Sequence, residues 1–305
     1  MDIIFNVNPL GLEGLGATLT SLVRNCSNSK ELKLLFLCSE FGKKDKANID
    51  LLLQSEKFKG TVRYIDFDAK GTFGHLKSLH GNWTTYGRLL IANYIKSDTA
   101  LYLDSDLVIL LDVLSLREFN FNGSLLAGVY GSSIEWVIDK DFFINHLKWS
   151  IEQGYFNAGV LLFNLKKWRE SKMEAKWKSL AEKYPEHLIS HDQTLLNAIC
   201  EGDFAHLSPV FNNPWYPGSD KPEDADSAQN SIIHFVGSPK PWDLFAKNIH
   251  KGHKIWKTFN TKTWKEQYGK IKMDKIIRFW KIRRSMLKLL KNSFLKEKEN
   301  VSSIQ

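Results

Sequence analysis

Strand-length apolar runs alternate with helical patterns through the first hundred residues of the chain. The strand-like runs are residues 3–7, 32–38, 61–67 and 100–104, and helical spacing fills residues 14–24, 44–57 and 84–95. Such alternation requires right-handed crossovers, which build a mostly parallel sheet with helices on its faces. With 305 residues the chain is long enough for one large domain of this kind. We therefore predict an α/β fold, whose ligands bind beyond the carboxyl ends of the strands.

The second half of the chain is less regular. We expect further strands at residues 125–130, 157–164 and 232–237, helices at residues 165–184 and 191–201, and a loop at residues 208–231. The loop assignment follows from four prolines, because proline fixes its own backbone and favours turns.

Cysteine usage and the apolar pattern point to a reduced, cytosolic setting. There are three cysteines and no Cys-x-x-Cys pair, so we expect neither a disulfide framework nor a thiolate zinc site. No apolar run reaches the ~18–20 residues of a membrane-spanning helix. The segment MDIIFNVNPLG reads as a first strand and not as a signal peptide.

Positive charge is concentrated near the C-terminus. The chain carries a net charge of +8, and residues 270–298 alone hold eleven Lys or Arg against two acids, which leaves −1 for the rest. We therefore divide the chain into a main domain, residues 1–260, and a basic amphipathic tail, residues 261–305. Helical spacing places several apolar residues near one side of this tail, namely Ile276, Phe279, Trp280, Leu287, Leu290 and Phe294.

A basic amphipathic helix with aromatic residues suits an anionic membrane surface. The competing interpretation is a helix that packs on the main domain and exposes its charged face to water. No nucleic-acid-binding motif accompanies the basic run, so we expect no nucleic-acid partner.

Two aspartates, Asp104 and Asp106, stand where the apolar strand of LYLDSDLVIL ends. If the chain turns between them, both carboxylates can converge on one hard cation such as Mg²⁺ or Mn²⁺. Taken alone, Asp-x-Asp is a short and common pattern, and one capping aspartate beside one solvated aspartate is the more frequent case. The sequence Asp-x-Asp-x-Val also fits a Mg²⁺-dependent phosphatase of the haloacid-dehalogenase type, but that site needs a later acidic pair, and only Asp203 is available.

A nucleotide-sugar transferase is the stronger interpretation, because the rest of the chain offers its other parts. His234 ends an apolar strand, and a neutral imidazole is a suitable Mn²⁺ ligand. Lys240 follows in a proline-bent loop, from which its ammonium group can hold a phosphate. A third class, a non-catalytic module that binds nucleotide or glycan, is supported only by the unusual segment FNVNPL.

Five segments in order resemble glycosyltransferase family 8: TTYGRLLIANYI, ALYLDSDLVIL, YFNAGVLLFNLKKW, HDQTLLNA and HFVGSPKPW. The likeness is to bacterial lipopolysaccharide and lipooligosaccharide α-galactosyl- and α-glucosyltransferases, with glycogenin more distant, and it covers about residues 1–260. It implies a GT-A fold with a mixed central sheet, and a retaining enzyme that uses a UDP-sugar and Mn²⁺, with Mg²⁺ as an alternative.

The resemblance also implies roles for individual residues. Asp104, Asp106 and His234 would bind the metal ion. The donor would be contacted by Arg88, Ser105, Gly237 and Lys240. Asn157, Asp192 and Gln193 would face the donor sugar, in a front-face mechanism that needs no nucleophile from the enzyme. His80 would lie near the acceptor.

The chain departs from the family pattern where relatives carry an acidic segment and an aromatic residue for the nucleotide. Here the first strand runs into FNVNPLG, so Asn6 and Asn8 are the candidate nucleotide contacts. After the strand at 125–130, residues 131–133 replace an aspartate that meets sugar in relatives. Taken together, we expect transfer of galactose or glucose from UDP-galactose or UDP-glucose to a glycan, glycolipid or glycoprotein acceptor, at the inner face of the cell membrane.

Overall fold

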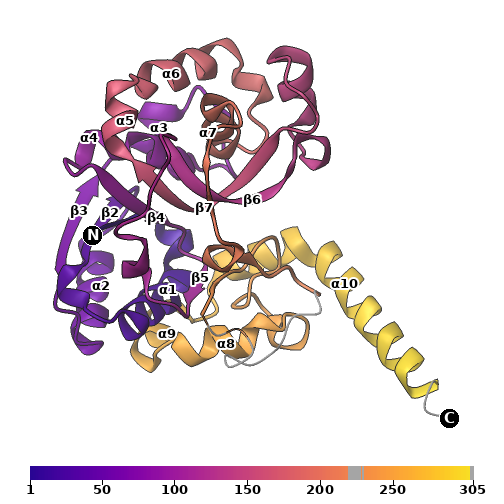
Figure 1. Cartoon of the computed structure of the whole chain (residues 1–305). Coiled ribbons are helices and arrows are strands. Elements are labelled where there is room, and N and C mark those ends of the chain that lie inside the picture. The colour runs from indigo at the N-terminus through magenta and orange to yellow at the C-terminus, as the bar shows by residue number, and fades with distance from the viewer. Residues whose placement is uncertain (219–227, 229, 303–305) are drawn as a thin grey trace.

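The computed structural model describes the backbone of residues 1–218, 228 and 230–302, and their side chains as far as Asn292. A seven-stranded sheet crosses the molecule in the order β3-β2-β1-β4-β7-β6-β8 (Figure 1). Its strands are β1 (Asp2–Val7), β2 (Lys33–Cys38), β3 (Thr61–Asp66), β4 (Thr99–Leu103), β6 (Leu126–Ser133), β7 (Gly154–Asn164) and β8 (Ala205–Leu207). The first four strands are parallel to one another, and β7 is antiparallel to both of its neighbours. The predicted mixed α/β sheet is thereby confirmed.

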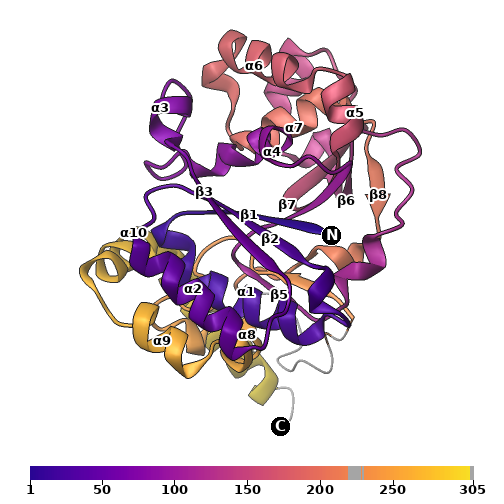
Figure 2. The same cartoon turned by 90° about the vertical axis from the view of Figure 1, so that its left-hand side faces the viewer.

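Helices cover both faces of this sheet, so the molecule has three layers (Figures 1 and 2). One face is covered by α1 (Leu12–Asn25), α2 (Lys43–Ser55), α8 (Gly252–Phe259) and α9 (Lys262–Tyr268). The other is covered by α3 (Ala69–Phe73), α4 (Ile91–Tyr94), α5 (Leu165–Glu170), α6 (Met173–Lys183) and α7 (Asp192–Cys200). In Figure 1, α10 (Met273–Ser302) extends away from this body.

Successive side chains along the strands pack alternately into two hydrophobic cores, one on each face of the large sheet. In β1, Ile3 and Phe5 pack with α1 and α2, whereas Ile4 between them packs on the opposite side with Tyr86 and Trp177. This is the period of two that an extended chain imposes, with both faces apolar because both are covered.

Two helices differ from the sequence prediction. The segment 84–95 is a 3₁₀-helix, η3 (Thr84–Leu90), followed by the single turn α4. The segment 165–184 is two helices, because Lys172 adopts φ 51° and this left-handed conformation ends α5 before α6 begins.

A second, three-stranded sheet was not predicted. It has the order β5-β10-β9 and consists of β5 (Leu107–Ile109), β9 (Asn213–Pro214) and β10 (Ile232–His234). Helix α1 runs along β5, where Thr18 and Ser21 receive hydrogen bonds from the backbone N–H groups of Leu107 and Ile109 at 3.0 and 2.9 Å. The two hydroxyl groups, one helical turn apart, thus accept hydrogen bonds from backbone N–H groups of the strand. This explains why polar side chains are buried on an otherwise apolar helix.

Helix α9 follows the expected boundary at residue 260, yet it packs on the main domain. Trp264 of α9 is buried, donates from Nε1 to the Leu12 carbonyl oxygen at 2.8 Å, and fills the space beside Gly16. Both α8 and α9 therefore belong to the packed body, and the helix that leaves it begins at Met273. None of the described helices combines the length and apolar character that crossing a membrane requires.

The predicted apolar side of the tail faces mainly solvent. Helix α10 leaves Ile276, Trp280 and Leu287 exposed to solvent, whereas Phe279 and Leu290 are partly buried. The helix docks on the body through an adjacent face, so only the edge of the apolar side is partly covered. Phe294 lies outside the described side chains, and residues 219–227 and 229 of the expected loop lie outside the described residues altogether.

Candidate active site

The turn Asp104-Ser105-Asp106 joins the two sheets. Asp104 follows β4 of the large sheet, and its N–H group donates to the Gly159 carbonyl oxygen of β7 at 2.9 Å. After Asp106 the chain enters β5 of the small sheet. The carboxylates therefore stand at the carboxyl end of a parallel strand, at the edge where α/β sheets bind ligands.

Strand register brings His234 to this turn. In the antiparallel pair of β5 and β10, His234 lies opposite Leu107, and the next N–H group, that of Phe235, donates to the Asp106 carbonyl oxygen at 3.1 Å. His234 Nε2 is 3.4 Å from Asp106 Oδ1. Ligand atoms of Asp104, Asp106 and His234 all lie within 4.8 Å of one another. The three residues predicted to bind metal thus form one cluster.

Asn212 fixes the orientation of the His234 ring. Its Oδ1 lies 2.9 Å from His234 Nδ1, and its Nδ2 donates to Asn157 Oδ1 at 3.0 Å. Because Asn212 engages Nδ1, Nε2 is the ring nitrogen that faces the cluster. Gly159 makes the room, since a Cβ atom there would lie 2.3 Å from His234 Cε1. Sequence analysis missed Asn212, which no motif distinguishes from the other residues of its loop.

Lys240 neutralises the second carboxylate. Its Nζ lies 2.6 Å from Asp106 Oδ2 and also donates to the Phe235 carbonyl oxygen. Burial alone would raise the pKa of Asp106, but Lys240 and His234 outweigh it and hold that pKa well below its usual range. Asp106 is therefore ionised at any physiological pH, as a metal ligand must be.

Arg88 serves the first carboxylate in the same way. This residue is only 6% exposed, and its guanidinium group lies 3.0 Å from Asp104 Oδ1 and 2.7 Å from Asp192 Oδ2. It also donates to the Ala158 carbonyl oxygen and lies over the Tyr102 ring, 4.3 Å from its centroid. Burial disfavours its charge, yet the two carboxylates raise its pKa overall. Arg88, Asp104 and Asp192 thus form one buried charge network.

The side chain of Gln193 is held by its neighbours. Oε1 accepts the N–H group of Ala158 at 2.9 Å, and Nε2 donates to the Tyr155 hydroxyl group at 3.1 Å. Burial raises the pKa of Tyr155, which stays protonated and donates to Asp139 at 3.0 Å. Asp139 is fully buried and also accepts from Thr194 at 3.0 Å. This supporting network was not predicted, because its members are distant in sequence.

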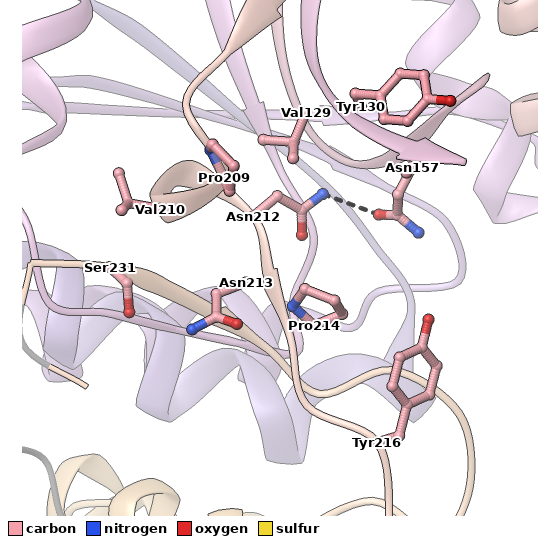
Figure 3. A pocket seen from close by; sticks show the side chains of 11 residues that line it. Val129, Tyr130, Asn157, Pro209, Val210, Asn212, Asn213, Pro214, Tyr216 and Ser231 are labelled. Carbon is pink, nitrogen blue, oxygen red and sulfur yellow. Dashed lines mark hydrogen bonds between the residues drawn. The ribbon is translucent and has the colours of Figure 1, made fainter. Parts of the chain in front are cut away.

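A pocket of about 370 Å³ opens beside the cluster. Figure 3 shows Asn157 at one side of it, with Tyr130 above and Tyr216 below, and Asn212 pointing toward Asn157. Tyr130 and Tyr216 are 48% and 54% exposed, so their rings are available to a ligand. The pocket adjoins the cluster, because Asn212 contacts both His234 and Asn157.

The remaining predicted site residues lie around this centre. Asn6 and Asn8 flank the end of β1, but Asn8 Oδ1 caps the following 3₁₀ turn by accepting from Leu10 and Gly11 at 3.0 and 3.2 Å. The buried Oδ1 atom of Asn6 has no hydrogen-bond partner in the structure. Ser105 is the middle residue of the turn, Gly237 adopts φ 80° before Lys240, and His80 is exposed in the loop after α3.

The cluster fits a divalent cation by its chemistry. It offers two carboxylates and one imidazole nitrogen, with each ligand tied to a second residue: Arg88, Lys240 or Asn212. Oxygen ligands with one nitrogen suit Mn²⁺, and such outer contacts are what orient metal ligands in proteins.

The model of the family "Glycosyl transferase family 8" matches residues 3–246. The chain belongs to this family. Lipopolysaccharide 1,3-galactosyltransferase of Salmonella typhimurium strain LT2 is 27% identical over 254 residues, which are 79% of this chain and 72% of that protein. Glycosyltransferase GlyF of Streptococcus pneumoniae serotype 4 is 23% identical over 69% of this chain, and the match spans only 50% of GlyF.

Among solved structures, the galactosyltransferase LgtC, crystallised with donor and acceptor sugar analogues, has the same fold. It aligns with a TM-score of 0.69 and 23% identity over 90% of this chain and 98% of LgtC. The GT-A fold expected for the chain is therefore confirmed, as is the family resemblance.

The phosphatase interpretation is not supported. Asp203, the only acid available for its second pair, accepts a hydrogen bond from Ser124 at 3.1 Å instead. Within the part of the chain that the structure describes, one group of three or more such ligands lies close enough together to hold a cation, namely Asp104, Asp106 and His234.

Proposed function

We propose that the protein is a retaining, Mn²⁺-dependent hexosyltransferase that moves galactose or glucose from a UDP-sugar to a glycan, glycolipid or glycoprotein acceptor. The observation that carries this proposal is the convergence of Asp104, Asp106 and His234 within 4.8 Å, beside the ammonium group of Lys240. Three metal ligands with a lysine ammonium group beside them suit a diphosphate leaving group better than any other common ligand.

Asp104, Asp106 and His234 would hold Mn²⁺, or Mg²⁺ in its place, and the bound ion would supply positive charge where the UDP diphosphate gains negative charge. Lys240 adds a second cation at the same place, with the backbone at Gly237 and Ser105 close by. Arg88 keeps Asp104 and Asp192 oriented, so their positions do not depend on the donor.

The donor sugar would lie against Asn157, Asp192 and Gln193. The Gln193 oxygen already accepts the Ala158 N–H group, which supports a binding role and argues against attack by this amide on the sugar. In the front-face mechanism that we favour, the anomeric C–O bond breaks and the acceptor hydroxyl oxygen bonds to the same face. The departing phosphate oxygen takes the acceptor's proton, so no nucleophile from the enzyme is needed.

The acceptor would enter through the pocket between Tyr130 and Tyr216, because rings exposed at 48% and 54% offer flat apolar faces to a sugar. His80, on its own exposed loop, is our second candidate acceptor contact. Neither the linkage nor the sugar follows from these residues, since a single hydroxyl contact decides between glucose and galactose.

Helix α10 would attach the enzyme to the inner, cytoplasmic face of the cell membrane. Its solvent-facing side combines the exposed Trp280 and Leu287 with the basic residues Lys281, Arg284 and Lys288. Trp280→Ala combined with Leu287→Ala should release the protein from vesicles of anionic lipid in a sedimentation assay. Unchanged binding by this double variant would reject the tail as the anchor.

The function itself is tested by UDP release from a panel of UDP-sugars, with Mn²⁺ or with a chelator, for the wild type and for Asp106→Ala. We expect one donor to be hydrolysed slowly in a Mn²⁺-dependent way, and the variant to be inactive. Phosphate release from simple monoesters, with indifference to UDP, would reject the proposal in favour of a phosphatase.

A further inference from the structure

Helix α10 has a docked face as well as an exposed one. Lys275, Arg278, Ile282 and Met286 recur at intervals of three or four residues, and all four are partly or fully buried. Met286 is only 2% exposed. Residues at this spacing lie on one side of a helix, so α10 is anchored to the body along its first half.

The anchor is made of ion pairs on the side of the helix away from solvent. Arg278 forms a two-bonded pair with Asp243, at 2.6 and 2.9 Å, and the Asp243 side chain is only 6% exposed. One turn earlier, Lys275 pairs with Glu13 of α1 at 2.5 Å. Planar two-bonded pairs of this kind fix direction as well as distance.

Asp243 connects this anchor to the candidate donor site. Its Oδ2 also accepts the backbone N–H group of Lys240 at 2.7 Å, and the Lys240 side chain reaches Asp106 at 2.6 Å. Two weaker contacts join the same loop to the helix: the Arg278 guanidinium group donates to Ser238 Oγ at 3.4 Å, and the Ser285 hydroxyl group donates to the Ser238 carbonyl oxygen at 3.3 Å.

We propose that Arg278 and Asp243 are positioning residues of the donor site, through which α10 holds Lys240 in place for the diphosphate. This inference rests on the proposed function, because it gives Lys240 the role of a phosphate contact. It makes α10 part of the transferase itself, in addition to any role at a membrane. Without Arg278 the Asp243 carboxylate would lose two of its three hydrogen bonds, and the loop that carries Lys240 would no longer be fixed.

The test is calorimetric binding of UDP in the presence of MnCl₂ to the full-length chain. Arg278→Ala should weaken UDP binding about tenfold, the order of one charge-assisted contact. Arg283→Ala is the matched control: Arg283 lies on the same helix, but its side chain contacts Trp280, one turn away. Thermal unfolding of each variant checks that the body stays folded.

A double-mutant cycle separates positioning from general stability. If Arg278 acts through Lys240, then Arg278→Ala should weaken UDP binding in the wild type but cause no further loss in Lys240→Ala. Arg278→Lys, which keeps the charge but not the planar fork, should restore part of the affinity. The cycle stays informative even where Arg278→Ala lowers the melting temperature, because a merely structural effect persists in both backgrounds.

Two results would overturn the inference, and each has a different consequence for the proposed function. Wild-type UDP affinity in Arg278→Ala, or an equal loss with and without Lys240, would reject the positioning role and leave the proposed function standing. Absence of Mn²⁺-dependent UDP binding by the wild type would reject the proposed function and this inference with it.

Discussion

The two carboxylates of the candidate metal site are held by different parts of the molecule. Asp104 takes its partners from nearby in the chain, with Tyr102 two residues away and Arg88 sixteen residues away. Asp106 pairs with Lys240, which is 134 residues away, and with His234 of the small sheet. The first half of the site is therefore part of the packed sheet, whereas the second half exists only once the C-terminal loops have closed over it. We therefore expect substitutions on the Asp104 side to lower both stability and activity, and substitutions on the Asp106 side to lower mainly activity.

The largest effect should come from Arg88→Ala on the sheet side. Removing one partner from a buried pair strands Asp192 and Asp104, which should lower the free energy of unfolding by about 3–5 kcal/mol and abolish transfer. Urea denaturation measures the free energy of unfolding, and UDP release measures transfer.

Lys240→Ala is the corresponding change on the Asp106 side of the site. It should abolish transfer and cost less stability than Arg88→Ala, because it leaves one carboxylate without its cation where Arg88→Ala leaves two. Equal destabilisation by both variants would contradict the division.

Asn212→Ala tests the small-sheet side without removing a metal ligand. The His234 ring would lose the contact at Nδ1 that sets its orientation, so Mn²⁺ affinity should fall about 10- to 100-fold. Titration with Mn²⁺ followed by calorimetry gives this value, and His234→Ala should fall further. If Asn212→Ala binds Mn²⁺ as the wild type does, the ring is oriented by packing alone.

The docking of α10 should depend on pH through Glu13. Burial raises the pKa of this carboxyl to about 7 against the opposing effect of Lys275. The folded state then holds a proton that the unfolded state releases from about pH 4.5 upward, so stability is lost as pH rises from there through about 7. Glu13→Gln should remove this slope, which is worth on the order of 3 kcal/mol.

Thermal unfolding between about pH 4 and pH 8 measures the Glu13 slope. Glu31→Gln is a suitable control, because Glu31 is only partly buried and lies in the turn before β2. A slope that persists in Glu13→Gln would place the titrating group elsewhere.

The smallest effect should come from the rim of the pocket. Tyr216→Ala removes an exposed ring that holds neither the metal ligands nor the sheet, so the KM for the acceptor should rise only a few-fold, or about 1 kcal/mol. Hydrolysis of the UDP-sugar without acceptor should not change. A change in hydrolysis instead would place Tyr216 at the donor.

Local sequence and the family motifs pointed to residues of both halves of the site, since Asp104, Asp106, His234 and Lys240 were all candidates. The β1 to β4 strands and the Asp104–Asp106 turn follow from periodicity and from the motifs, whereas the segment that carries Arg88 is a 3₁₀-helix, η3, in place of the expected helix over residues 84–95. The small sheet did not follow, because a pairing between residues 107–109 and 232–234 is set by long-range register that no short pattern encodes. For the same reason Asn212, Tyr155 and Asp139 were missed: each acts through a partner distant in sequence.

Helix α10 was predicted as a basic helix, but not its two faces. Periodicity shows that apolar residues gather along a helix, and it cannot say which of them meet another part of the chain. The ion pairs of Lys275 and Arg278 with Glu13 and Asp243 decide this, and they join charges 262 and 35 residues apart.

The register of β5 and β10 also has a consequence for synthesis of the chain. His234 completes the cluster only after three quarters of the polypeptide has been made, and Lys240 only after that. A nascent chain still lacking these residues carries the sheet, Arg88 and both aspartates, but not the parts that gather charge on a diphosphate. On the proposed mechanism such a chain lacks groups needed for transfer, and the site is complete only when the C-terminal segment has folded into place.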